Sequence, residues 1–149
     1  MRIPALPMAV IGLQIVLAGL APTLGDEQLP IRKAGRWRLT TVSDSVGMKT
    51  FETCISAADP LVTGIGDKKC TVSRTKRIAD ELYVDVVCRT GIGTQTTSTV
   101  FTGDFTTWYH AMSKITLEPP QGGYDHMGVT IDGKFLGSDC DPKSSPTSH

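Results

Sequence analysis

A hairpin bracketed by two cysteines constrains the fold of this chain more than any other feature. The segment CTVSRTKRIADELYVDVVC runs from Cys70 to Cys88, and folding it about Ala79 places the two cysteines opposite each other. Opposed residues of a non-hydrogen-bonded antiparallel pair have Cβ atoms roughly 4.5–5.5 Å apart, close to the spacing that a disulfide requires. The sequence therefore predicts a β-hairpin closed by a Cys70–Cys88 disulfide.

The same folding axis sets the register of the hairpin. Val72 then lies opposite Val86, and Arg74 lies opposite Val84. The turn, residues 77–81, contains neither Gly nor Asn, so we expect a loop of about three to five residues in place of a tight two-residue turn. Both arms of the hairpin are counted as strands of the predicted sheet.

The two remaining cysteines predict a second disulfide by elimination. Cys54 and Cys140 lie far apart in the sequence, and their bond would tie the last predicted strand back near the second. A zinc site is the alternative for these cysteines, but no pair of them has the short spacing that such sites favour. We therefore expect two disulfides, which form and persist in oxidising compartments.

The amino terminus has the features of a secretory signal peptide. Met1 and Arg2 give a positive start, residues 5–21 are almost entirely apolar, and small residues lead to a predicted cleavage near Gly25. An uncleaved anchor is the alternative, although prolines and a glutamine interrupt the apolar run. We expect a periplasmic or secreted domain, with no membrane span once the signal peptide, residues 1–25, is removed.

Alternation of apolar and polar residues with a period of two predicts further strands on both sides of the hairpin. We expect a flexible lead-in at residues 26–34, one disulfide-stapled domain at residues 35–140 and a polar tail at residues 141–149. With about seven strands and short turns, the domain is predicted to be all-β. An antiparallel meander would form a strongly bent sheet or a partly open barrel, and a two-sheet sandwich is the alternative. The further strands are 35–42, 48–54, 96–102, 105–117 and 124–132.

Two connections between these strands also have a predicted conformation. The first is expected to begin with a short helix that Ser56 caps. Residues 118–123 contain two prolines and two glycines and are expected to form a loop.

Four aromatic residues are candidates for lining a concave binding surface. Trp and Tyr combine apolar bulk with a polar tip, which suits contact with an apolar ligand. Trp108 and Tyr109 are neighbours in a predicted strand, so their side chains point to opposite faces and only one of them faces the core. Packing in an ordinary core is the alternative role for the set. The candidate ligand-binding residues are Trp37, Phe101, Trp108 and Tyr109.

Histidine and methionine side chains form the candidate metal site. His110 and Met112 share one face of a predicted strand, and His126 and Met127 lie on the strand that we expect beside it. Thioether and imidazole ligands suit copper in an exported protein. Core packing of the methionines is the alternative, and the prediction is that no metal or other cofactor binds.

No catalytic residue stands out in the sequence. Hydrolysis needs a nucleophile, a base and a group that orients the base. Asp125 precedes His126, but neighbours in a strand point to opposite faces, so adjacency alone does not make it an orienting partner. A hydrolase is therefore only a minor alternative. The chain has 15 basic and 15 acidic residues, which argues against the basic stripe that a nucleic-acid partner requires.

Four motifs lie along the predicted domain. They are the strand start Gly35-x-Trp37, the run Cys54-Ile55-Ser56-Ala57-Ala58-Asp59, the Cys70–Cys88 hairpin, and the run Gly133-Lys134-Phe135-Leu136-Gly137-Ser138-Asp139-Cys140. Together they resemble the family called Domain of Unknown Function 3617, with one departure at Ser138, where a shorter Gly-Asp-Cys ending is expected. The resemblance implies an exported bacterial protein with disulfides, and it assigns no catalytic residue.

These observations predict a periplasmic binding module or an envelope-associated structural module. Its partner would be an unknown apolar ligand or an envelope protein. A copper-binding periplasmic protein and a minor hydrolase are the alternatives.

Overall fold

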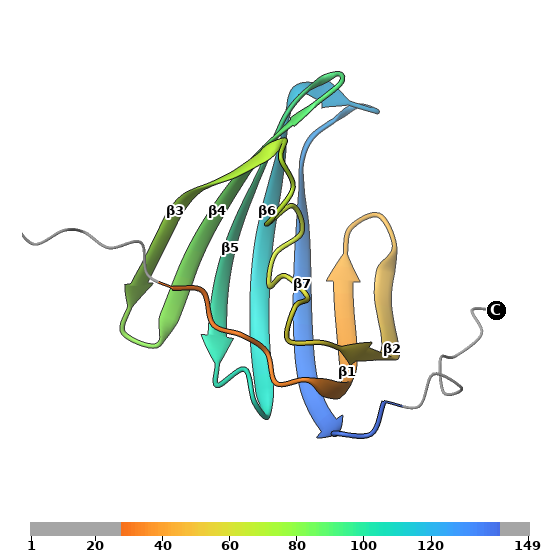
Figure 1. Cartoon of the computed structure of the whole chain (residues 1–149). Coiled ribbons are helices and arrows are strands. Elements are labelled where there is room, and N and C mark those ends of the chain that lie inside the picture. The colour runs from red at the N-terminus through yellow and green to blue at the C-terminus, as the bar shows by residue number, and fades with distance from the viewer. Residues whose placement is uncertain (1–27, 141–149) are drawn as a thin grey trace, which may run out of the picture.

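A single antiparallel sheet makes up the domain in the computed structural model (Figure 1). Its seven strands stand in the order β2-β1-β7-β6-β5-β4-β3. The prediction of an all-β antiparallel meander is thus confirmed. The strands are β1 (Gly35–Ser43), β2 (Gly47–Ile55), β3 (Cys70–Ile78), β4 (Glu81–Thr90), β5 (Gly93–Gly103), β6 (Trp108–Gln121) and β7 (Tyr124–Gly137).

The structure describes residues 28–140. The predicted signal peptide, residues 1–25, and the predicted tail, residues 141–149, lie outside the described residues. Within residues 28–140, no helix is long and apolar enough to cross a membrane.

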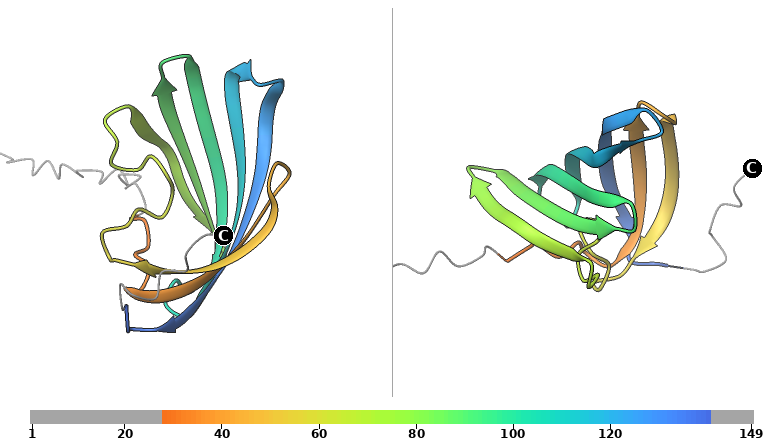
Figure 2. Two further views of the ribbon diagram at one scale, coloured as in Figure 1. Left: turned by 90° about the vertical axis from the view of Figure 1, so that its right-hand side faces the viewer. Right: turned by 90° about the horizontal axis from the view of Figure 1, so that it is seen from above.

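The sheet is open, because β2 and β3 form its two edges and do not pair with each other. It forms a single layer and is not strongly curled (Figure 2). The sheet is therefore neither the strongly bent sheet or partly open barrel that was expected nor the two-sheet sandwich given as the alternative. Segments outside the strands cover the apolar face instead, so this face is buried without closure of the sheet.

Alternation along the strands gives the sheet one apolar face, called here the inner face. On β4, Leu82, Val84 and Val86 are buried on this face, while Tyr83 and Asp85 point to the opposite, outer face and are only partly buried. Burial of one such aliphatic side chain contributes roughly 1.5–3 kcal/mol. The core cluster on the inner face comprises Trp37, Ile55, Val62, Leu82, Val84, Val86, Phe101, Phe105, Tyr109 and Ala111.

Two segments without regular structure cover the inner face. Residues 56–69, called here the strap, connect β2 at one edge of the sheet to β3 at the other and cross the inner face (Figures 1 and 2). Val62 of the strap is part of the core cluster. Residues 28–34 lie on the same side, where Lys33 N donates to Phe105 O at 2.9 Å. The edge-to-edge connection is therefore also the cover of the sheet.

The turn of the β3–β4 hairpin is tighter than predicted. Ile78 pairs with Glu81, which leaves only Ala79 and Asp80 in the turn instead of three to five residues. Ala79 has a φ of 54°, the left-handed conformation that Gly or Asn adopts more readily. The expectation was wrong because strand pairing on both sides holds the turn strongly enough to impose this conformation on Ala.

A β-bulge in β3 compensates for the tight turn. Arg74 pairs with Asp85, not with Val84 as predicted, because the register shifts by one residue just before Arg74. Beyond the bulge, Cys70 pairs with Cys88. The cysteine pairing is thus as predicted, whereas the predicted register near the turn is wrong. The shift also places Arg74 Nε 2.8 Å from Asp85 Oδ2 in an ion pair.

Strand β6 is longer than predicted. It continues to Gln121, although residues 118–123 were expected to form a loop. Pro119 and Pro120 fall between Thr116 and Gln121, where the pairing with β7 is irregular. Their missing N–H groups therefore remove no ladder hydrogen bond, which makes prolines acceptable in this part of the strand.

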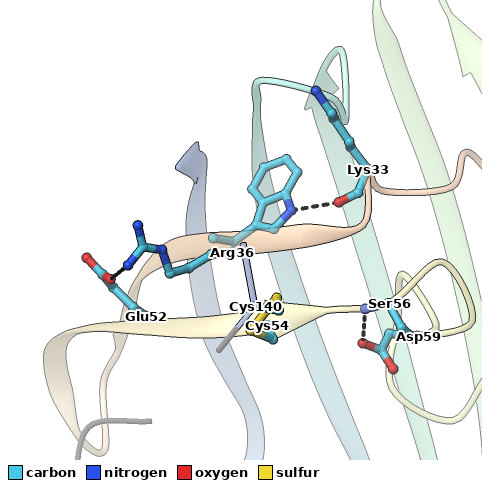
Figure 3. Close-up of a disulfide and its surroundings, with 8 residues drawn as sticks. Lys33, Arg36, Glu52, Cys54, Ser56, Asp59 and Cys140 are labelled. Atoms are coloured by element: carbon cyan, nitrogen blue, oxygen red, sulfur yellow. Dashed lines mark hydrogen bonds and ion pairs between the residues drawn. A yellow bond between two sulfur atoms is a disulfide. The ribbon is translucent and has the colours of Figure 1, made fainter. Parts of the chain in front are cut away.

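Both predicted disulfides are present. Cys70–Cys88 joins residues 18 positions apart, and Cys54–Cys140 joins residues 86 positions apart. The second bond reaches from the end of β7 across β1 to the edge strand β2, beside Arg36 (Figure 3). Two disulfides indicate an oxidising compartment outside the cytoplasm.

The turn between β5 and β6 contains a strained aromatic residue. Phe105 is buried and has a φ of 60°. Asp104 organises this turn by accepting hydrogen bonds from Thr106 N at 2.7 Å, from Thr107 N at 2.6 Å and from Thr107 Oγ1. These bonds, those from Thr107 most of all, hold the pKa of Asp104 well below its ordinary value. The ionised carboxylate therefore supports the turn that carries Phe105.

We predict that Ala79→Gly stabilises the domain. Glycine adopts a positive φ without the steric cost that a Cβ adds, so the free energy of unfolding should rise by roughly 0.5–1 kcal/mol. Denaturant unfolding measures this change. Ala57→Gly is the matched control, because Ala57 is also exposed in a turn but has no positive φ. An equal change in the free energy of unfolding for both substitutions would contradict the inference that the backbone at Ala79 is strained.

We predict that Asp104→Asn lowers the melting temperature at neutral pH. Because the pKa of Asp104 is depressed in the folded state, its stabilising effect is present above about pH 4 and is lost as the pH falls further. The difference in melting temperature between the wild-type protein and Asp104→Asn should therefore become smaller below about pH 4. Asp44→Asn is the control, since the Asp44 side chain bonds no other residue of 28–140. A difference in melting temperature that does not change with pH would contradict the stabilising role of the ionised Asp104 carboxylate.

Candidate functional site

A cavity of about 480 Å³ lies between the inner face and the strap. Its volume falls within the range of small-molecule sites, about 300–1,000 Å³. One wall comes mainly from β5, β6 and β7, and the other from residues 60–64 of the strap. The described lining residues are Arg32, Leu39, Pro60, Leu61, Val62, Thr63, Gly64, Gln95, Thr97, Thr99, Phe101, Tyr109, Ala111, Ser113, Ile115, Val129 and Ile131.

The cavity is elongated along β6. Alternate residues of this strand line it, from Tyr109 at one end to Ile115 at the other. At a rise of about 3.4 Å per residue, these two positions lie about 20 Å apart. The cavity, called here the channel, therefore extends along the central strands.

An aromatic cluster closes the Tyr109 end of the cavity. The Tyr109 ring stacks on Phe105 with centroids 6.1 Å apart, and it lies 5.5 Å from the Trp37 ring. The Trp37 indole Nε1 donates to Lys33 O at 2.8 Å (Figure 3). Gly133, which pairs with Tyr109, leaves room for this ring, because a Cβ there would lie 2.3 Å from it. Tyr109 is thus held rigidly from three sides.

Hydroxyl groups interrupt the apolar wall in the middle of the cavity. Thr97 and Thr99 of β5 are buried on the inner face. Thr99 Oγ1 and Ser113 Oγ of β6 share a hydrogen bond of 2.8 Å. Threonine and serine are mostly exposed in folded proteins. Their position beside an unfilled space is typical of a ligand site, where apolar surface is combined with a few polar groups.

Arg32 brings the positive charge of a guanidinium to the Tyr109 end of the cavity. Its Nη1 donates to Tyr109 Oη at 3.3 Å, and its Nη2 donates to Pro60 O at 2.9 Å. The guanidinium carbon also lies 5.8 Å from the centroid of the Tyr109 ring. Arg32 therefore connects the lead-in, the sheet and the strap at one point.

The two ends of the strap are anchored by the two disulfides. Cys54 precedes the strap by two residues, and Cys70 follows it directly. Gly64 packs against the second bond so closely that a Cβ at this position would lie 2.8 Å from Cys88 Sγ. Within residues 28–140, the backbone–backbone hydrogen bonds of the strap close local turns, except for Arg89 N, which donates to the carbonyl of residue 69 at 2.8 Å. The middle of the strap thus rests on the sheet through side chains.

The first turn of the strap is not the short helix that Ser56 was expected to cap. Instead, Ser56 N donates to Asp59 Oδ2 at 2.7 Å, and Asp59 N donates to Ser56 O at 3.2 Å (Figure 3). The hydrogen bonds from Ser56 lower the pKa of Asp59, and the charge of Arg32 adds to this effect. The reciprocal bonds close a single turn, and Pro60 directly afterwards disfavours continuation as a helix.

The four aromatic candidates fall in three different places. Phe101 and Tyr109 line the cavity. Trp37 is fully buried in the aromatic cluster behind Tyr109. Trp108 is 50% exposed on the outer face, whereas Tyr109 is 3% exposed, in agreement with the expectation that only one of the two neighbours faces the core.

The four residues of the copper alternative do not share one face of the sheet. His110 and Met112 lie on the outer face, where His110 Nδ1 is 2.7 Å from Asp132 Oδ1. His126 pairs with Thr116 and faces outward, but Met127 pairs with Ile115 of the cavity wall. Within residues 28–140, no group of three or more His, Cys, Asp or Glu side chains is arranged to hold a metal ion.

Sequence reasoning missed Arg32 and the strap. Neither the lead-in nor residues 56–69 have a regular pattern that would place them on the sheet. One feature of the sequence could have indicated the cavity. Thr97 and Thr99 occupy the same face of β5 as the apolar Phe101, which places hydroxyl groups on the inner face. The described lining offers hydroxyl, amide and guanidinium groups but no carboxylate, imidazole or thiol. The arrangement thus provides apolar contact, hydrogen bonds and one positive charge.

We predict opposite outcomes for alanine substitution at the two neighbouring aromatics. Tyr109→Ala should lower the free energy of unfolding by about 3–5 kcal/mol, because it empties the aromatic cluster. Trp108→Ala should change it by less than about 1 kcal/mol. Chemical denaturation measures both. Tyr109→Phe, which removes only the bond from Arg32, should cost about 1 kcal/mol. A large loss for Trp108→Ala would contradict the assignment of faces.

The chain matches one protein-family model, described as Protein of unknown function (DUF3617), over residues 32–140. No curated protein and no solved structure matches it. The match covers the sheet, the strap and both disulfides, and it confirms the resemblance seen in the sequence motifs. The chain belongs to the DUF3617 family.

Proposed function

We propose that this domain is a binding module that holds a small, largely apolar ligand between the inner face and the strap. The observation that carries the proposal is the cavity of about 480 Å³, lined by aliphatic and aromatic side chains of sheet and strap. A packed protein interior leaves few voids larger than a water molecule. A space of this size beside buried hydroxyls therefore argues for an occupant.

The strap supports this function because it is fixed at its ends and held only by side chains in its middle. Val62 and Leu61 contribute apolar contacts to the core, and Gly64 rests on the Cys70–Cys88 bond. Movement of the middle of the strap would admit a ligand without breaking any strand pairing. The sheet would stay rigid while the strap adapts to the ligand.

The proposed place of action is the bacterial periplasm, after cleavage of a signal peptide near Gly25. Two disulfides are consistent with it, since the periplasm is an oxidising compartment. A soluble carrier of apolar molecules or a module that captures an apolar segment of an envelope protein would both act there. The volume of the cavity, about 480 Å³, lies in the range of small-molecule sites and favours the small molecule.

We predict that the oxidised mature protein binds decanol and the neutral dye N-phenylnaphthylamine. Ile115→Trp fills the far end of the cavity and should weaken binding at least about tenfold, because burial of several methylene groups is lost at about 0.8 kcal/mol each. Dye fluorescence and calorimetric titration measure the affinities. Intact mass of the protein from its envelope fraction checks the cleavage.

Met112→Trp is the matched control for this experiment. Met112 lies on the same strand but is 52% exposed on the outer face, so a larger side chain there should leave binding unchanged. Circular dichroism confirms that both variants are folded. Absence of binding, or equal loss of binding in both variants, would refute the proposed function.

A further inference from the structure

We infer that the ligand is an amphiphile with an extended apolar chain and a carboxylate head group, which Arg32 binds at the Tyr109 end of the cavity. This inference rests on the proposed function and adds the chemical class of the ligand. It follows from three observations: the charge of the lining, the hydrogen-bond donors of Arg32, and the shape of the cavity.

The described lining of the cavity carries one positive charge and no negative charge, since Arg32 is its one charged side chain. No carboxylate of residues 28–140 lies within ion-pair distance of Arg32. The Asp59 carboxylate acts on Arg32 at longer range, is bonded to Ser56 N and does not line the cavity. An anionic group of a ligand in the cavity would therefore be the first to contact this cation directly.

The guanidinium retains donors that no described residue uses. It has five N–H groups, of which one on Nη1 bonds Tyr109 Oη and one on Nη2 bonds Pro60 O. Nε is covered by protein atoms and has no partner among the described residues, so the second N–H on each terminal nitrogen is the donor left for a ligand. Two parallel N–H groups of Arg match the two oxygens of a carboxylate. Tyr109 and Pro60 hold the guanidinium in place, so little side-chain entropy is lost on binding.

The shape of the cavity fits an extended chain behind such a head group. The channel follows the strands for about 20 Å away from Arg32, past Ala111 and Ser113 to Ile115. Val129 and Ile131 of β7 line its side. A volume of about 480 Å³ with apolar side chains of β5, β6 and β7 along this length has room for an extended alkyl chain. A polar group at one end and apolar walls beyond it define an amphiphile.

A cationic amphiphile would fit poorly, because its head group would lie beside Arg32 and repel it. A neutral amphiphile would gain the apolar contacts alone. The series decanoate, decanol and decylamine therefore has one chain length with a negative, a neutral and a positive head group. Comparison within this series separates the contribution of Arg32 from that of the channel.

The test measures the affinity of the oxidised mature protein for these three compounds by calorimetric titration and by displacement of N-phenylnaphthylamine. Decanoate should bind roughly tenfold to a hundredfold more tightly than decanol, as expected for hydrogen bonds to a charged group, and decylamine should bind most weakly. Arg32→Gln should remove the preference for decanoate, so that decanoate and decanol bind this variant with affinities within about threefold of each other.

Two further variants complete the experiment. Lys33→Gln is the matched control, since Lys33 is the adjacent cation but lies over the Phe135 ring, outside the cavity; this variant should keep the preference. Arg32→Lys keeps the charge without the paired donors and should keep only part of the preference for decanoate. If thermal unfolding shows that Arg32→Gln is too unstable to titrate, Arg32→Lys replaces it in the test.

Each other outcome contradicts a specific claim. Equal affinity of the wild-type protein for decanoate and decanol would overturn the role of Arg32 while leaving the proposed function intact. A preference for decanoate that survives in Arg32→Gln would overturn it as well. Failure of all three compounds to bind would refute the proposed function and, with it, this inference.

Discussion

The apolar inner face of an open, single-layer sheet must be covered by something other than a second sheet or a helix. In this domain the cover is the strap, together with the lead-in, and the rest of the architecture depends on this contact. Val62 seals the strap against the core, and Arg32 joins lead-in, sheet and strap. Because irregular chain covers a regular surface, the two do not interlock completely, and the cavity lies where they separate.

The disulfides acquire a specific role in this arrangement. Each one holds a different end of the strap: Cys54–Cys140 where the strap leaves β2, and Cys70–Cys88 where it enters β3. They also hold the two edge strands, which have neighbours on one side only. Cross-links at these places restrain the parts of the fold with the fewest hydrogen bonds, and an oxidising compartment keeps the restraints in place.

Strand positions, the Cys70–Cys88 pairing and the division of Trp108 and Tyr109 between two faces could be predicted, because all three follow from the two-residue period of a strand. The Cys54–Cys140 pairing then followed by elimination. The turn at Ala79 could not, since its conformation is imposed by the strands on either side. The cavity was also beyond prediction. It depends on Arg32 and on the path of the strap, segments without periodicity whose positions are set by contacts with residues distant in the sequence.

A strap fixed at both ends moves differently from a hinged lid. It has no free tip, so an opening of the cavity would have to displace its middle, around residues 60–64, from the sheet while both ends stay in place. The amplitude is limited by the slack in the chain, and the size of the opening is set by the length of the connection. Insertions or deletions in this segment would thus change which molecules enter, while the sheet and both cross-links stay the same. In such a design, one scaffold can acquire new ligand preferences through changes in a single loop.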